Sequence, residues 1–322
     1  MNQRGLAPIA AVIILAVLTS AIGIKVFQSK ANFVALQGVE TQRSTPMPSP
    51  APSLTPTPTP ISTPTATPEP TIVSTVKPTM APAPIVINNT PPGSGYSRQT
   101  VSVEGQNYTV SIIAADLNST KVIVDTASDS DCTNDCPVLS LADYAGRNGA
   151  WAGINGSYFC PADYANCAGK ANSYDTLLMN KNKRYFNSDN NVYSTVPAAI
   201  FSAGSARFVS RSLEWGRDTG VDSVIANYPL LIAGSNINFT EAPNEPKFGG
   251  KAARTFIASK RNMVYIGVVY NASMGESAKV LHTMGMDGAL NLDQGGSTAL
   301  WSGGYIAGPG RRIPNAILFV NR

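Results

Sequence analysis

The chain has a single histidine, His282, among its 322 residues, which excludes any catalytic or metal site that needs two histidines. A surplus of either charge is also missing from the carboxy-terminal two thirds. Five basic and two acidic residues precede residue 96, which leaves 19 basic and 18 acidic residues in the remainder. A nucleic-acid binder needs a basic surface to neutralise phosphates, so we expect no nucleic-acid partner.

Two common catalytic loops are absent as well. No glycine-rich run is followed by Gly-Lys-Ser or Gly-Lys-Thr, which excludes a phosphate-binding P-loop. The pattern Gly-x-Ser-x-Gly does not occur either, which excludes the nucleophile elbow of serine hydrolases. Nucleotide hydrolysis and ordinary esterase chemistry are therefore not indicated.

An uncharged apolar run of 19 residues occupies positions 6–24. As a helix it would span roughly 29 Å, about the thickness of a hydrocarbon core. Basic residues flank the run on both sides and orient it only weakly. We predict that residues 1–30 form a membrane anchor or a signal segment. Cleavage after the small residues 19–21, or pilin-like processing, remains open.

Residues 31–95 read as a disordered linker rich in threonine and proline. Fifteen of the 24 prolines fall between Pro46 and Pro92, and so little apolar content cannot offset the entropy of ordering. Extended as polyproline II, residues 45–92 would reach at most about 150 Å. The segment is either a spacer that lifts a domain off a membrane or a linker with no required length.

Residues 96–322 have the composition of one folded domain. The apolar patterns predict a hairpin over 100–113, strands at 121–126, 150–154, 289–292, 301 and 316–320, and hairpins over 198–210 and 254–270. Helices are predicted over 139–147 and 273–284, the second with a capping box between Ser273 and Glu276. We therefore expect an α+β (mixed α/β) fold, a single strand-rich domain with two or three helices.

The four cysteines form two local pairs, Cys132 with Cys136 and Cys160 with Cys167. Local pairing as two small disulfides is the simplest arrangement, and a zinc site using all four thiolates is the alternative. Disulfides and a Thr/Pro-rich linker favour a place outside the cytoplasm. The expected location is a single-pass anchor in the cell membrane with the carboxy-terminal domain outside, or else secretion.

Three polar clusters lie at predicted strand ends, where sites are commonly assembled. They are residues 153–159, residues 253–257 and residues 287–298. In the third, Asp293 precedes Gly295 and Gly296, whose backbone amides can approach a ligand closely. Its carboxylate suits a base, a sugar ligand or a metal ligand, but a tight turn would explain the same residues.

Each of the other clusters also has a functional and a structural interpretation. Arg254 offers a planar fork of donors that matches phosphate, or else forms a salt bridge with an acid such as Asp287. Asn155 binds a sugar or holds a turn. The aromatic rings of Tyr158, Phe159 and Trp301 suit sugar stacking and core packing equally.

The clusters occur in the order Asn-Gly-x-Tyr-Phe, Ala-Arg-Thr and Asn-Leu-Asp-x-Gly-Gly-Ser. Over roughly residues 100–322 this order resembles the phosphodiester glycosidase domain, found in the lysosomal uncovering enzyme and in bacterial exopolysaccharide-associated proteins. One departure is Gln294, because the family usually has glycine at this position. The resemblance implies an extracytoplasmic hydrolase that cleaves a sugar-1-phosphodiester in cell-envelope or exopolysaccharide glycans.

The resemblance also implies roles for individual residues. Asp293 would be the base or nucleophile and Arg254 would bind the phosphate. The expected substrate-binding residues are Asn155, Thr255, Asp287, Asn291, Gly295, Gly296, Ser297 and Asn315. No cofactor is expected, and a metal requirement and the oligomeric state are left open. The alternatives are a non-catalytic glycan-binding module on a membrane-anchored stalk and a structural surface protein.

Overall fold

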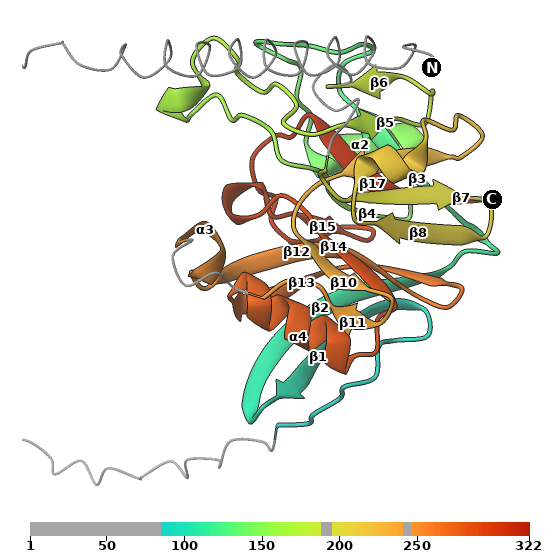
Figure 1. The fold of residues 1–322 in the computed structure, drawn as a ribbon, viewed down its shortest axis with the longest axis vertical. Coiled ribbons are helices and arrows are strands. Elements are labelled where there is room, and N and C mark those ends of the chain that lie inside the picture. The colour runs from blue at the N-terminus through green and yellow to red at the C-terminus, as the bar shows by residue number, and fades with distance from the viewer. Residues whose placement is uncertain (1–84, 188–194, 241–245) are drawn as a thin grey trace, which may run out of the picture. The chain divides into compact units, whose positions relative to one another are not determined.

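The structure is a computed structural model that describes residues 85–187, 195–240 and 246–322 (Figure 1). The predicted membrane segment at 1–30, and the linker as far as residue 84, lie outside the described residues. Within the described ranges, no helix has the length and the apolar character needed to cross a membrane.

The described chain folds into three antiparallel sheets with short helices, which confirms the α+β expectation (Figure 1). In spatial order, the first sheet contains β1 (Gly95–Val103), β2 (Gln106–Asp116), β13 (Met263–Ala272), β12 (Ala252–Lys260), β14 (Gly288–Asn291), β10 (Leu230–Ala233) and β11 (Asn236–Ile237). The second contains β16 (Tyr305–Ala307), β15 (Leu300–Trp301), β4 (Ala152–Asn155), β17 (Asn315–Asn321) and β3 (Thr120–Thr126). The third contains β6 (Tyr185–Phe186), β5 (Leu178–Met179), β9 (Ser223–Ala226), β7 (Ala198–Ser202) and β8 (Ser205–Val209).

Inner strands such as β12 and β17 are apolar on both faces because other parts of the chain cover both sides of them. Side chains alternate between faces along a strand. In β12, Ile257 points into a core shared by all three sheets, while Phe256 points into a second core beneath helix α4 (Met274–Thr283). In β17, Ile317 joins the shared core and Leu318 packs against helix α2 (Leu141–Asn148). Continuous apolar runs such as these are what two-sided burial requires.

The helices end where their capping residues predict. Ser273 accepts a hydrogen bond from the backbone N–H of Glu276, whose carboxylate accepts one from the backbone N–H of Ser273, which confirms the predicted capping box. A second box between Ser140 and Asp143 starts α2, and Gly149 closes that helix in the left-handed conformation. The described chain also contains a short helix, α3 (Pro246–Gly249). Its 3-10 turns are η1 (Ala165–Cys167), η3 (Ser212–Trp215) and η4 (Gly295–Ser297).

The predicted hairpins are present with shifts of a few residues at their ends. β1 and β2 pair across Glu104 and Gly105, and β12 and β13 pair across Arg261 and Asn262. Ordered contacts begin before the expected domain start at residue 96. The N–H of Asn88 donates to the carbonyl of Thr100, 2.8 Å away, and this contact extends the first sheet beyond the expected boundary.

The two central strands β14 and β4 belong to different sheets, and the residues that follow them meet at one point. The N–H of Asp293, two residues after β14, donates to the carbonyl of Gly156, the residue after β4, at 2.9 Å. Thus the first and third polar clusters of the sequence are joined through the backbone.

The capping box of α4 gives a direct test of local stability. Replacing Ser273 by Ala removes the side-chain acceptor, and we expect the free energy of unfolding to fall by about 1 kcal/mol. Urea unfolding measures the change, with the exposed Ser130→Ala as the matched control. Equal stability of the two variants would contradict this account of the helix start.

Candidate active site

The three polar clusters converge on the backbone of Asp293. Its carbonyl oxygen accepts a hydrogen bond from Asn155 Nδ2 at 2.6 Å and another from the hydroxyl of Thr255. Its N–H is held by the carbonyl of Gly156. Asn155 from the first cluster and Thr255 from the second therefore bind the carbonyl oxygen of Asp293, and Gly156 binds its N–H. These three contacts fix the backbone from which the Asp293 side chain extends.

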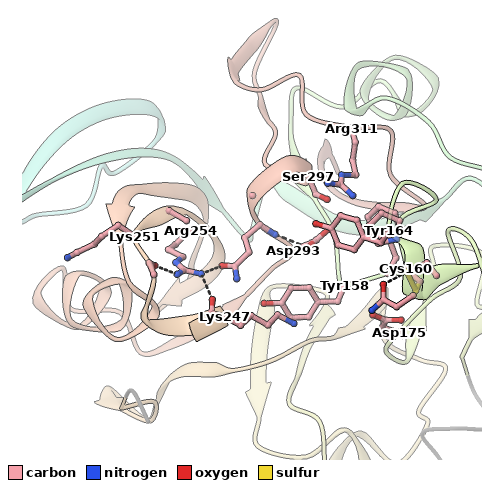
Figure 2. A pocket seen from close by; sticks show the side chains of 18 residues that line it. Tyr158, Cys160, Tyr164, Asp175, Lys247, Lys251, Arg254, Asp293, Ser297 and Arg311 are labelled. Atoms are coloured by element: carbon pink, nitrogen blue, oxygen red, sulfur yellow. Dashed lines mark hydrogen bonds between the residues drawn. A yellow bond between two sulfur atoms is a disulfide. The ribbon is translucent and has the colours of Figure 1, made fainter. Parts of the chain in front are cut away.

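A pocket of about 520 Å³ opens beside this junction. Six charged side chains line it: Asp175, Lys247, Lys251, Arg254, Asp293 and Arg311. Figure 2 shows Asp293 between Arg254 and Lys251 at one end of the pocket and Tyr164 and Arg311 at the other. Four cations against two acids in the lining make the pocket a place for a negatively charged ligand. Two of these cations also have acidic partners outside the lining, since Lys251 pairs with Glu276 and Arg311 with Asp163.

Asp293 is half-buried, and its carboxyl has a pKa that the pocket shifts towards neutrality. Burial raises its pKa to about 6, although hydrogen bonds from Ser297 and from the N–H of Gln294, and the charges of Arg311 and Lys247, act in the opposite direction. A carboxyl that titrates near neutrality in a pocket is suited to acid–base or nucleophilic work. Burial and the nearby Asp293 raise the pKa of Tyr158 well above its ordinary range, so its hydroxyl stays protonated.

Arg254 is buried, with 2 % of its surface exposed, and all five of its N–H donors have acceptors. Four acceptors are the backbone carbonyls of Ala272, Lys247, Phe248 and Gly250. The fifth is the side-chain oxygen Oε1 of Gln294. The salt bridge with Asp287, considered from the sequence, is not formed. Arg254 holds the segment 247–250 to the end of β13, and it lines the pocket as well.

Four predicted substrate-binding residues, Asn155, Thr255, Asn291 and Asn315, are buried and bonded to protein atoms, and none lines the pocket. Asn291 Nδ2 donates to the Tyr158 hydroxyl at 2.8 Å, and Asn315 Oδ1 accepts from the N–H of Ser157 at 2.9 Å. These four residues therefore do not reach the pocket in this structure, and their direct contact with substrate stays a prediction. They form the frame that holds Asp293 and Tyr158.

Asp287 is also misplaced by the sequence interpretation. It precedes β14 whereas Asp293 follows it, so the strand separates the two carboxylates, and Asp287 accepts hydrogen bonds from Ser235 and from the N–H of Arg261. Gly296 packs against Arg311 instead of lining the pocket, because an added Cβ would lie 2.4 Å from the Arg311 guanidinium. The remaining predicted residues, Gly295 and Ser297, line the pocket together with Asp293 and Arg254.

Gln294 stands where the resemblance expects glycine, and its backbone tolerates a side chain. Its φ of −138° is an extended conformation open to any residue. Gly156 does require glycine, because a Cβ there would lie 1.7 Å from Asn315 Oδ1. Glutamine in place of glycine at position 294 therefore does not strain the backbone. It changes the side chains that line the pocket.

Sequence reasoning did not single out Lys247, Arg311 or Tyr164. The Lys247 ammonium lies 4.1 Å from the ring centroid of Tyr158, and the Arg311 guanidinium lies 5.0 Å from that of Tyr164. Tyr164 belongs to the loop closed by the Cys160–Cys167 disulfide, which forms as predicted, as does Cys132–Cys136. The disulfide was the one signal in the sequence that this loop is held in place.

The residues that the structure describes contain no group of three or more His, Cys, Asp or Glu side chains that could hold a metal ion together. The pocket contributes charges and donors from its own side chains. It offers a carboxyl that titrates near pH 6, cations on both sides, and hydroxyl donors from Ser297 and Tyr158. Such an arrangement suits a substrate that carries a phosphate next to a carbon open to attack.

The catalytic domain of a zebrafish enzyme has a similar fold. The catalytic domain of zebrafish N-acetylglucosamine-1-phosphodiester alpha-N-acetylglucosaminidase, auto-inhibited by its pro-peptide, has a TM-score of 0.55 at 17% identity, covering 71% of this chain and 83% of that one. A hypothetical protein from Synechocystis has a TM-score of 0.49 at 13% identity, covering 70% of this chain, which spans 62% of that protein's length.

No curated protein sequence matches the chain. The sequence model of the phosphodiester glycosidase family matches residues 148–320, just over half of the chain. This stretch contains all three polar clusters, the disulfide-closed loop and every charged residue of the pocket. The chain therefore belongs to the phosphodiester glycosidase family.

Proposed function

We propose that this protein is an extracytoplasmic hydrolase that cleaves a sugar-1-phosphodiester in cell-envelope or exopolysaccharide glycans. The observation that carries the proposal is Asp293, a carboxyl with a pKa of about 6 in a pocket flanked by cations. Family membership supports hydrolysis of this bond type. The zebrafish relative, named for an N-acetylglucosamine-1-phosphodiester substrate, supports a sugar of this kind.

The proposed reaction breaks the bond between the anomeric carbon and the phosphate oxygen. The electron pair of that bond leaves with the phosphomonoester, and the carbon takes a water oxygen while Asp293 acts as base or nucleophile. Lys247 and Arg311 would neutralise the phosphate. Ser297, whose hydroxyl donates to Asp293 in the unliganded protein, would turn to donate its one hydrogen bond to the phosphate. Because phosphate is a good leaving group, stabilisation of charge matters more here than general-acid help.

The location outside the cytoplasm is part of the same proposal. Two disulfides support an oxidising compartment, and the apolar run at 6–24 supports a single-pass anchor or a secretory signal. In the proposed arrangement the Thr/Pro-rich segment joins the domain to the membrane, and envelope glycans are then within reach of the pocket.

A non-catalytic glycan-binding module is the second candidate. The observation in its favour is that all five donors of Arg254 are already engaged, one of them by Gln294. A module of this kind would bind envelope glycan without releasing sugar. Release of sugar from a synthetic sugar-1-phosphodiester by the full chain separates the two candidates.

The first prediction concerns the carboxylate of Asp293. Asp293→Asn should lower the rate of sugar release by at least about a hundredfold, because the base or nucleophile is lost. In the wild type, kcat/KM should rise as the pH increases through about 6, where Asp293 ionises. The matched control is Asp129→Asn, at an exposed acid outside the pocket. An unchanged rate in the Asp293 variant would remove the assignment.

The second prediction concerns stability. The pKa of Asp293 is about 6 in the folded protein and near 3.8 in an unfolded chain, so the folded state prefers the protonated carboxyl. Ionisation at neutral pH therefore costs up to about 3 kcal/mol, and the cost is absent below the unfolded pKa. Asp293→Asn should raise the free energy of unfolding at pH 7.5, with the gain shrinking towards pH 4. Urea unfolding at both pH values checks this, and a loss of stability at pH 7.5 would contradict it.

The third prediction concerns Lys247. Replacing it by Met removes a cation from the pocket, and kcat/KM should fall roughly tenfold to a hundredfold, the range for a hydrogen bond to a charged group. Because Lys247 also lowers the pKa of Asp293, the inflection of the pH profile should move to higher pH. Lys121→Met, on β3 away from the pocket, serves as the control. Identical profiles for the two variants would exclude this role.

A further inference from the structure

On the pocket side, the side chain of Gln294 is a hydrogen-bond partner of Arg254. Its Oε1 accepts a hydrogen bond from Arg254 Nη1, and both residues line the pocket. Gln294 is half-buried and follows Asp293 directly, with its own N–H donating to Asp293 Oδ1 at 2.9 Å. A neutral amide oxygen therefore occupies a donor that an anionic oxygen would otherwise take.

The other contacts of Arg254 cannot be exchanged in the same way. They run to backbone carbonyls in segment 247–250 and at the end of β13. The bonds to Ala272 and Phe248 are buried, and giving up either would leave a buried carbonyl without its partner. Among the contacts of Arg254 given above, the one with Gln294 can open by rotation of that residue's side chain. Since the backbone at Gln294 is extended, no strain ties the carboxamide to this place.

We propose that Gln294 is a specificity-determining residue that competes with anionic ligands for Arg254, an inference that rests on the proposed function. An incoming phosphate must displace the tethered amide before it reaches the guanidinium. When the phosphomonoester product departs, Gln294 returns to Arg254. The residue thereby weakens the binding of every phosphate that uses Arg254, the product included, and favours release over retention.

Binding of inorganic phosphate to the purified full chain tests this without requiring turnover. In isothermal titration calorimetry, Gln294→Ala should bind phosphate about tenfold more tightly than the wild type because Arg254 Nη1 is exposed. Gln294→Glu keeps the length of the side chain and places a carboxylate on Arg254, so it should bind phosphate about tenfold more weakly. Gln106→Ala, at an exposed glutamine at the start of β2, should leave the affinity unchanged.

The inference would be overturned if Gln294→Ala bound phosphate as tightly as the wild type, or more weakly. It would also be overturned if neither protein bound phosphate detectably. If Gln294→Ala does not fold by circular dichroism, the Gln294→Glu comparison decides, and affinity equal to the wild type then overturns the inference.

The hydrolysis assay separates this inference from the proposed function. Sugar release by the wild type together with unchanged phosphate affinity in Gln294→Ala would reject the role of Gln294 and leave the hydrolase in place. Tighter phosphate binding by Gln294→Ala, with no sugar released by any variant, would support the role of Gln294 and reject the hydrolase. If both hold, inhibition by added phosphate should be about tenfold stronger in Gln294→Ala than in the wild type.

Discussion

The site depends on the hydrogen bonds that hold the backbone N–H and carbonyl of Asp293. Gly156 holds its N–H, while Asn155 and Thr255 hold its carbonyl oxygen. These partners come from two different sheets, so the two sheets must dock before the carboxyl is placed. Buried hydrogen bonds of this kind are costly to leave unmade, and they turn sheet packing into a fixed position for one side chain.

The electrostatics of the pocket follow from that placement. Packing half-buries the Asp293 carboxyl, which raises its pKa, while Lys247 and Arg311 limit the rise to a value of about 6. A carboxylate held this way is ready to react but is unfavourable for the folded state at neutral pH. The Arg254 guanidinium donates to the backbone carbonyls of Lys247, Phe248 and Gly250, and these bonds hold the segment from which Lys247 enters the pocket.

Local signals in the sequence were sufficient for much of the fold. The capping box at Ser273 and the continuous apolar runs of β12 and β13 depend on neighbouring residues alone, and each appears where expected. The family motifs located the junction but not the roles within it. Asn155 and Thr255 were expected to touch substrate, yet both are buried, because a motif reveals that a residue matters without showing which way its side chain points.

The cations that complete the pocket were beyond sequence reasoning for a related reason. Arg311 and Lys247 lie outside the motifs and reach the site only through the three-dimensional path of the chain. Asp287 shows the opposite case. It was assigned to the cluster because it is close to Asp293 in sequence, but β14 lies between the two residues and separates them.

The central claim is that this pocket receives a phosphorylated sugar with its anomeric carbon at Asp293. A crystal structure of the protein with a sugar-1-phosphate bound tests it most directly. The account predicts the phosphate within hydrogen-bonding distance of the pocket's cations and the anomeric carbon facing the Asp293 carboxyl. A sugar phosphate bound at another surface, with the pocket unoccupied, would contradict it.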